Sequence, residues 1–132
     1  MISSTHPSAS WFLLISSVFF FFIYAMPLFL FPLRWARWFA WNVPTGNTDL
    51  TVYFGRCLGG LALTALFMML QAVPDPVTHR DAFTMVAWIG AFMTVVHIWG
   101  AARRAQPWTE DVEIGLYAMM TGLSLYFRST LG

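Results

Sequence analysis

The sequence predicts an all-α integral membrane protein, a four-helix bundle with a short interfacial helix after the first span. Of the 132 residues, 58% are hydrophobic and 10% are charged, whereas about 25% of the residues in a soluble domain are charged. The apolar residues form continuous runs, which is typical of membrane helices and not of a β-barrel. These runs fit four spans of about 20 residues, at 11–32, 51–73, 82–102 and 112–128.

The four spans leave only short tails and loops, so residues 1–132 are expected to form a single transmembrane domain. The formal net charge is +1, which is too small for binding a polyanion, so nucleic acid is not an expected partner. Cys57 is the one cysteine, which excludes an intramolecular disulfide and dithiol redox chemistry. Neither a nucleotide-binding loop nor a nucleophile elbow is present, and we do not expect an enzyme.

The first span contains Pro27 and ends at Pro32. Proline has no backbone N–H, so a kink is expected near Pro27. In the loop that follows, Trp recurs every third residue with Arg in between. Trp prefers the lipid headgroup layer and Arg prefers anionic lipid, which favours a membrane-surface helix over a dedicated partner-docking surface. The predicted anchor residues are Arg34, Trp35, Arg37, Trp38 and Trp41.

The later loops contain candidate helix caps. Asp81 is a possible N-cap of the third helix, and Thr109 a possible N-cap of the fourth. Glu110 and Asp111 would then lie in the first turn of the fourth helix, where the helix dipole favours acidic side chains.

The arginines in the loops predict an orientation. Loops 33–50 and 103–111 are expected on the same side of the membrane and together contain four Arg residues, whereas the other side has two. The positive-inside rule then places these two loops in the cytoplasm and both termini outside.

Helical spacing separates inward from outward faces. Small residues let membrane helices approach closely, so stripes of small or polar residues should face the bundle and bulky stripes the lipid. Gly55 and Gly59 form a GxxxG pattern that likewise predicts a close contact in the second span. The inward stripes are Ala87, Gly90, Thr94, His97 and Ala101 in the third span and Glu113, Tyr117, Met120 and Ser124 in the fourth; the outward stripe is Trp88, Phe92, Val95 and Trp99.

A polar layer is predicted near the cytoplasmic ends of the helices. At 1.5 Å per residue, Arg56, His97 and Glu113 all lie roughly 2–8 Å inside the helix ends. Tyr53 and Tyr117 are near enough to join them. One interpretation is an Arg56–Glu113 ion pair with His97 as a hydrogen-bond partner, which fixes the helix packing. The other is a ligand pocket or proton-handling site, because ionisable residues inside a membrane often have a function.

Metal and pigment chemistry have little support in the sequence. His97 is the only histidine inside a span, so a haem with two His ligands is not expected. No His, Cys and carboxylate cluster has zinc-type spacing, and no metal site is predicted. His97 remains a candidate pigment ligand, and bound lipid, quinone or pigment are the ligands left open.

Helices two to four contain a motif made of the segment Tyr53–Gly59, His97, the segment Gln106–Glu110 and Glu113. Over residues 50–128 this motif resembles small bacterial four-helix membrane proteins of the broad DoxX-like kind. It implies a four-helix fold in a bacterial inner membrane more than a particular activity. Some members accompany quinone-linked redox enzymes as small membrane subunits. Members with paired cysteines do not fit this chain. The small multidrug exporters are similar in size but need an acidic residue in the first helix, which is absent here.

Two functions are compatible with these features. The first is a non-catalytic accessory subunit of a larger redox or photosynthetic membrane complex, with lipids and other membrane subunits as partners. The second is a stand-alone binder or transporter of a small lipophilic molecule such as a quinone, which would use the predicted polar layer.

Overall fold

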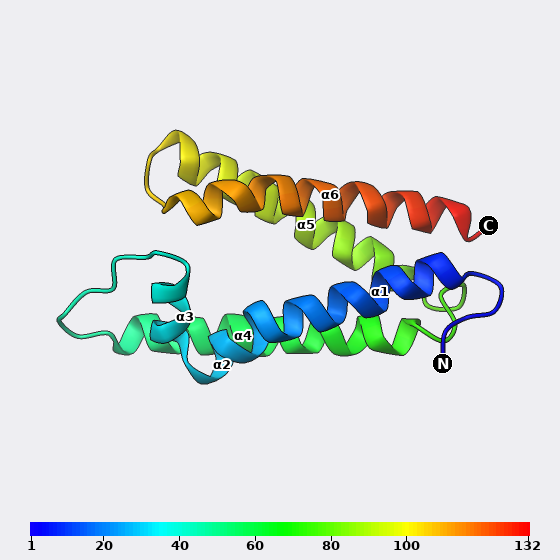
Figure 1. Ribbon diagram of the computed structural model, residues 1–132, viewed down its shortest axis with the longest axis horizontal. Coiled ribbons are helices and arrows are strands. Elements are labelled where there is room, and N and C mark those ends of the chain that lie inside the picture. Colours follow the sequence, from blue (N-terminus) through cyan, green and yellow to red (C-terminus); the bar gives the residue numbers. More distant parts are fainter.

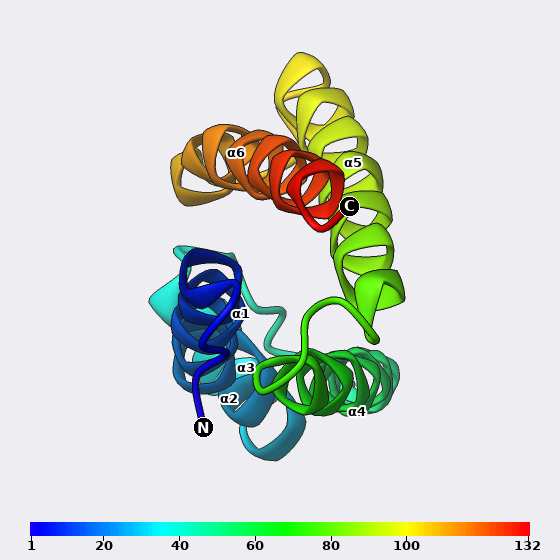
Figure 2. The same cartoon turned by 90° about the vertical axis from the view of Figure 1, so that its right-hand side faces the viewer.

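The computed structural model describes residues 1–132, which form helices and no strand. The two views in Figures 1 and 2 show two layers: α4 lies with the first helical segment, and α5 with α6. In chain order the helices are α1 (Pro7–Phe20), the π-helical turn η1 (Phe21–Ala25), α2 (Met26–Leu30), α3 (Pro32–Trp38), α4 (Asp49–Ala72), α5 (Arg80–Ala102) and α6 (Trp108–Thr130).

Three helical segments are long and apolar enough to cross a membrane: Pro7–Leu30, Asp49–Ala72 and Arg80–Ala102. This finding supports the prediction of a membrane protein with transmembrane helices. Helix α6 has 23 residues, as many as α5. However, α6 has acidic residues in its first turns and a basic residue near its end, so its composition alone does not identify it as a membrane span.

The predicted inward and outward faces of α5 and α6 are confirmed. The bulky stripe of α5 is 62–68% exposed on the surface of the chain. The small stripe of α5 is buried or half-buried, and all four residues of the α6 stripe are buried. At the crossing of the two helices, a Cβ on Gly90 would lie 2.5 Å from Thr121 Oγ1 and 3.0 Å from the carbonyl oxygen of Tyr117, so the absence of a side chain favours this close approach.

The first helical segment is irregular near Pro27, where the sequence predicts a kink. The irregularity is the π-helical turn η1, directly before α2. Pro27 cannot donate to the carbonyl four residues earlier, Ile23 O. The indole Nε1 of Trp35 donates to that carbonyl instead, at 2.8 Å. Trp35 therefore compensates for the hydrogen bond that Pro27 removes.

Helix α4 packs closely against α2 and α3 through the predicted GxxxG pattern. A Cβ on Gly59 would lie 2.5 Å from the backbone nitrogen of Phe29, and one on Gly55 would lie 2.5 Å from Pro32 Cβ. Both distances are shorter than a real carbon contact, so the backbones meet here because the glycines have no side chain.

The connection between α4 and α5 corrects one predicted cap. Helix α5 begins at Arg80, and the residue before it is His79, so Asp81 lies in the first turn and is not the N-cap. Within the connection, Thr78 donates its backbone N–H to Asp75 Oδ1 at 3.2 Å. Hydrogen bonding from Thr78 lowers the pKa of Asp75 below its ordinary value.

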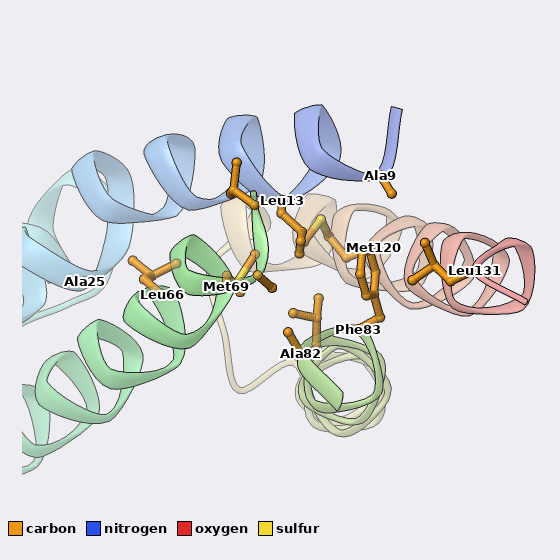
Figure 3. Packing of buried hydrophobic residues seen from close by; sticks show 12 residues of the cluster. Ala9, Leu13, Ala25, Leu66, Met69, Ala82, Phe83, Met120 and Leu131 are labelled. Atoms are coloured by element: carbon orange, nitrogen blue, oxygen red, sulfur yellow. The ribbon is translucent and has the colours of Figure 1, made fainter. Parts of the chain in front are cut away.

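The apolar core lies toward the end of the molecule where the two termini are found (Figure 1). Figure 3 shows side chains from α1, α4, α5 and α6 meeting there: Leu13, Met69, Phe83 and Met120. Only 26 of the 132 residues are buried, and many large hydrophobic side chains are exposed, as expected when lipid or another subunit covers them. The connections 39–48 and 103–107 lie at the opposite end from the termini (Figure 1).

Candidate functional site

The turn between α5 and α6 positions the candidate site. Helix α5 ends in a Schellman motif, because Ala105 N–H donates to Gly100 O and Arg104 N–H to Ala101 O, both at 3.0 Å. This motif needs a left-handed residue, and Arg104 has φ 50°. The tight turn brings the last two turns of α5 against the first two turns of α6.

Gln106 and Thr109 fix the turn to its surroundings. Gln106 Nε2 donates to the backbone oxygen of His97 at 3.0 Å and to Asp111 Oδ1 at 2.8 Å. Thr109 was predicted to cap α6, but it lies inside that helix and its hydroxyl donates to Phe39 O at 2.6 Å. Thr109 instead attaches the start of α6 to the segment after α3.

Three buried ionisable groups meet at this end of the molecule. His97 Nε2 lies 3.0 Å from Glu110 Oε2 and 3.5 Å from Glu113 Oε2. The three side chains are at most 9% exposed. We call them the His97 cluster. Each residue has one atom that could bind a metal ion, and these three atoms lie within 4.8 Å of one another.

Hydrogen bonds outside the His97 cluster orient its members. His97 Nδ1 lies 2.6 Å from Met93 O, and a carbonyl oxygen can only accept, so Nδ1 is the protonated nitrogen. The other nitrogen, Nε2, is thereby turned to the carboxylates. Trp41 Nε1 donates to Glu110 Oε1 at 2.8 Å, whereas Glu113 Oε1 has no hydrogen-bond partner.

Aromatic rings join the His97 cluster to an apolar cavity. The rings of His97 and Tyr117 are 5.1 Å apart, and that of Tyr117 is 6.2 Å from Phe20. Phe20 is in turn 5.0 Å from Tyr24, a residue of the π-helical turn. Tyr24, Tyr117 and Phe20 also line a cavity of about 110 Å³, whose other walls come from α4, α5 and Met120 of α6.

The predicted polar layer is present in part. The structure brings together His97, Glu113 and Tyr117. Arg56 and Tyr53 lie on an exposed face of α4, with Tyr53 63% exposed. The predicted Arg56–Glu113 ion pair is therefore wrong: both salt bridges of the chain involve His97. The reason is the rotation of α4 about its axis: Arg56 lies on the exposed side of this helix, whereas Gly55 and Gly59 face α2 and α3.

Glu110, Tyr24 and Trp41 are not among the residues predicted for the polar layer. Glu110 was recognisable, because it precedes Glu113 by three residues and therefore lies on the same face of α6. Tyr24 follows no regular helical stripe, since the π-helical turn alters the register around it. The hydrogen bond between Trp41 and Glu110 could not be predicted from a sequence pattern, because the two residues are 69 positions apart.

The predicted interfacial anchor divides into two groups. The expected short helix is present as α3, in which Arg34, Arg37 and Trp38 are exposed and Trp38 is 66% exposed. The other two tryptophans make internal contacts: Trp35 bonds to the first helical segment, and Trp41 to Glu110.

Comparison with protein-family models, with curated proteins and with solved structures found no match.

Proposed function

We propose that the chain is an integral membrane protein whose four long helical segments form a bundle and bind a small lipophilic molecule. The observation that supports this most directly is the apolar cavity of about 110 Å³ that borders the His97 cluster through Tyr117. This cavity lies among α1, η1, α4, α5 and α6, and its walls are apolar.

The fourth span in this proposal is α6. Its 23 residues are about 35 Å long at 1.5 Å per residue, enough to cross a bilayer core of about 30 Å. Its acidic residues Glu110 and Glu113 face the protein interior, so they do not meet lipid. Arg128 lies near the other end, where an arginine reaches the headgroups. We further propose an inner-membrane location with loops 33–50 and 103–111 in the cytoplasm.

The size and lining of the cavity restrict the ligand. An apolar cavity of about 150 Å³ holds a benzene molecule, so about 110 Å³ suits one small ring with slight side-chain adjustment. A haem or chlorophyll macrocycle is much larger. The walls expose apolar atoms only, so the hydroxyl groups of Tyr24 and Tyr117 would donate to a ring carbonyl after a side-chain rotation. A quinone headgroup, whose apolar ring has carbonyl oxygens on opposite sides, has this chemistry.

A second candidate function is an accessory subunit of a larger membrane complex. The observation that favours it is the outward stripe of α5, on which Trp88, Phe92, Val95 and Trp99 are 62–68% exposed. Such a surface packs against another membrane subunit as well as against lipid. The DoxX-like resemblance agrees with both candidates, because some of those proteins accompany quinone-linked enzymes.

The binding proposal is tested with radiolabelled short-chain quinone and purified protein in lipid nanodiscs. Empty nanodiscs give the background that comes from partition into lipid. We expect saturable binding of one quinone per chain above this background. Ala65→Phe places a ring in the cavity and should raise the Kd by roughly tenfold or more, since each tenfold change is 1.4 kcal/mol.

Thr64→Phe is the matched control, because Thr64 is the preceding residue of α4 and is exposed. It adds a ring to the lipid-facing side and should leave quinone binding unchanged. Non-saturable binding, or equal Kd values for Ala65→Phe and wild type, would contradict a ligand in this cavity. If wild-type protein extracted in mild detergent also migrates with other membrane subunits, the accessory function is supported.

A further inference from the structure

The His97 cluster has an unbalanced charge. Two carboxylates, Glu110 and Glu113, are buried beside one imidazole, and both salt bridges of the chain are the ones to that imidazole. No arginine makes a salt bridge with either carboxylate. In addition, Glu113 Oε1 is buried without a hydrogen-bond partner. A buried carboxylate without compensation is costly, so the site is suited to a cation.

The spacing of the ligand atoms matches a metal ion. At metal–ligand distances of about 2.0–2.1 Å, neighbouring ligands of a tetrahedral ion lie about 3.3 Å apart. The distances from His97 Nε2 to Glu110 Oε2 and Glu113 Oε2 are 3.0 and 3.5 Å. Both distances from His97 Nε2 are therefore close to the separation that one shared ion needs, and all three ligand atoms lie within 4.8 Å of one another.

The surroundings of the His97 cluster also match those of metal ligands. A ligating histidine normally donates its other N–H to a carbonyl or carboxylate, which fixes the tautomer. His97 has this arrangement, with Nδ1 on Met93 O at 2.6 Å and Nε2 facing the carboxylates. A ligating carboxylate is normally hydrogen-bonded as well, and Trp41 Nε1 supports Glu110 at 2.8 Å.

We propose that His97 Nε2, Glu110 Oε2 and Glu113 Oε2 bind one divalent transition-metal ion, of the class of Zn²⁺, Fe²⁺ or Mn²⁺. One imidazole nitrogen and two carboxylate oxygens suit these ions, whereas Ca²⁺ and Mg²⁺ prefer oxygen ligands only. A neutral imidazole, two carboxylates and a divalent ion sum to zero charge. Three protein ligands leave one coordination position open for water or another ligand. Metal binding by the His97 cluster does not depend on quinone binding.

The test uses full-length protein purified without a polyhistidine tag, stripped with a chelator and titrated with Co²⁺ and Zn²⁺. We expect one ion per chain, visible Co²⁺ absorption bands of a four- or five-coordinate site, and displacement of Co²⁺ by Zn²⁺. The variants Glu110→Gln, Glu113→Gln and His97→Ala should lose these bands. Trp41→Phe should keep them with an affinity about 10–100-fold lower.

Asp111→Asn and His79→Ala are the matched controls, since both residues are exposed and lie outside the His97 cluster. Both should bind the metal as wild type does. The proposal is overturned if the wild-type protein gives only the pale spectrum of solvated Co²⁺, or if the bands persist in Glu110→Gln and Glu113→Gln. The wild-type spectrum decides the matter even if a variant does not fold.

Discussion

Trp41 and Glu110 are 69 residues apart in the sequence, and the indole Nε1 donates to the Glu110 carboxylate at 2.8 Å. This hydrogen bond joins the segment after α3 to the first turn of α6. It also supplies one of the few polar contacts available to a buried carboxylate. The residue that looked like a membrane-surface anchor is therefore part of the candidate site.

Trp41→Phe keeps an aromatic ring but removes the donor. A hydrogen bond to a charged group is worth about 1.5–3 kcal/mol, so we expect a loss of this size in the free energy of unfolding. Chemical denaturation in detergent, with chelator present, measures it. In a double-mutant cycle with Glu110→Gln the losses should be less than additive. Fully additive losses would show that the two residues do not interact.

Arg56→Ala tests the correction to the predicted polar layer. Arg56 is exposed on α4 and makes no salt bridge, so its removal should change the free energy of unfolding by no more than about 0.5 kcal/mol. The same denaturation assay measures the change. A loss of several kcal/mol, comparable to that caused by Glu113→Ala, would instead support an Arg56–Glu113 ion pair.

Ala40→Gly should stabilise the protein. Ala40 has φ 60°, because α3 ends in a Schellman motif with Ala40 N–H on Arg37 O and Trp41 N–H on Ala36 O. A left-handed conformation costs an L-residue about 1–2 kcal/mol and costs glycine little. We expect a gain of up to about 1 kcal/mol, since glycine also loses more entropy on folding. Thermal unfolding measures the change. Ala36→Gly, within α3, is the control and should destabilise the protein.

Gly59→Ala and Gly60→Ala are a matched pair in α4. A Cβ on Gly59 meets the backbone of Phe29 at 2.5 Å, whereas one on Gly60 meets the flexible ring of the same residue at 3.9 Å. We expect Gly59→Ala to lower the free energy of unfolding by about 1–3 kcal/mol through overpacking. Gly60→Ala should be neutral or stabilising, because alanine favours helix. Equal effects of the two substitutions would contradict the close contact between α4 and α2.

Helical periodicity was enough to predict the faces of α5 and α6. Small residues, such as Gly90, and polar residues, such as His97, share one stripe because membrane helices approach through small side chains and shield polar ones. The predicted spans 11–32, 51–73 and 82–102 lie close to the three helical segments that are long and apolar enough to cross a membrane, because apolar runs have the length of the bilayer core. One error concerns how a helix is rotated relative to its neighbours.

Arg56 illustrates this limit. Its depth along α4 was predicted from residue counting, but depth says nothing about direction around the helix axis. Trp41 and Tyr24 show two further limits, a long-range contact without periodicity and a π-helical turn that changes the register. The DoxX-like resemblance stays a prediction.

The most direct test of the proposed function is photo-crosslinking with a diazirine-bearing quinone in nanodiscs, followed by peptide mass spectrometry. We predict labelling of cavity residues, above all Tyr24, Met69 and Tyr117, and its competition by unlabelled quinone. Labelling confined to the outward stripe of α5, including Trp88 and Trp99, and insensitive to unlabelled quinone would contradict the proposal. That result would mean that the quinone meets this protein only as part of the surrounding lipid.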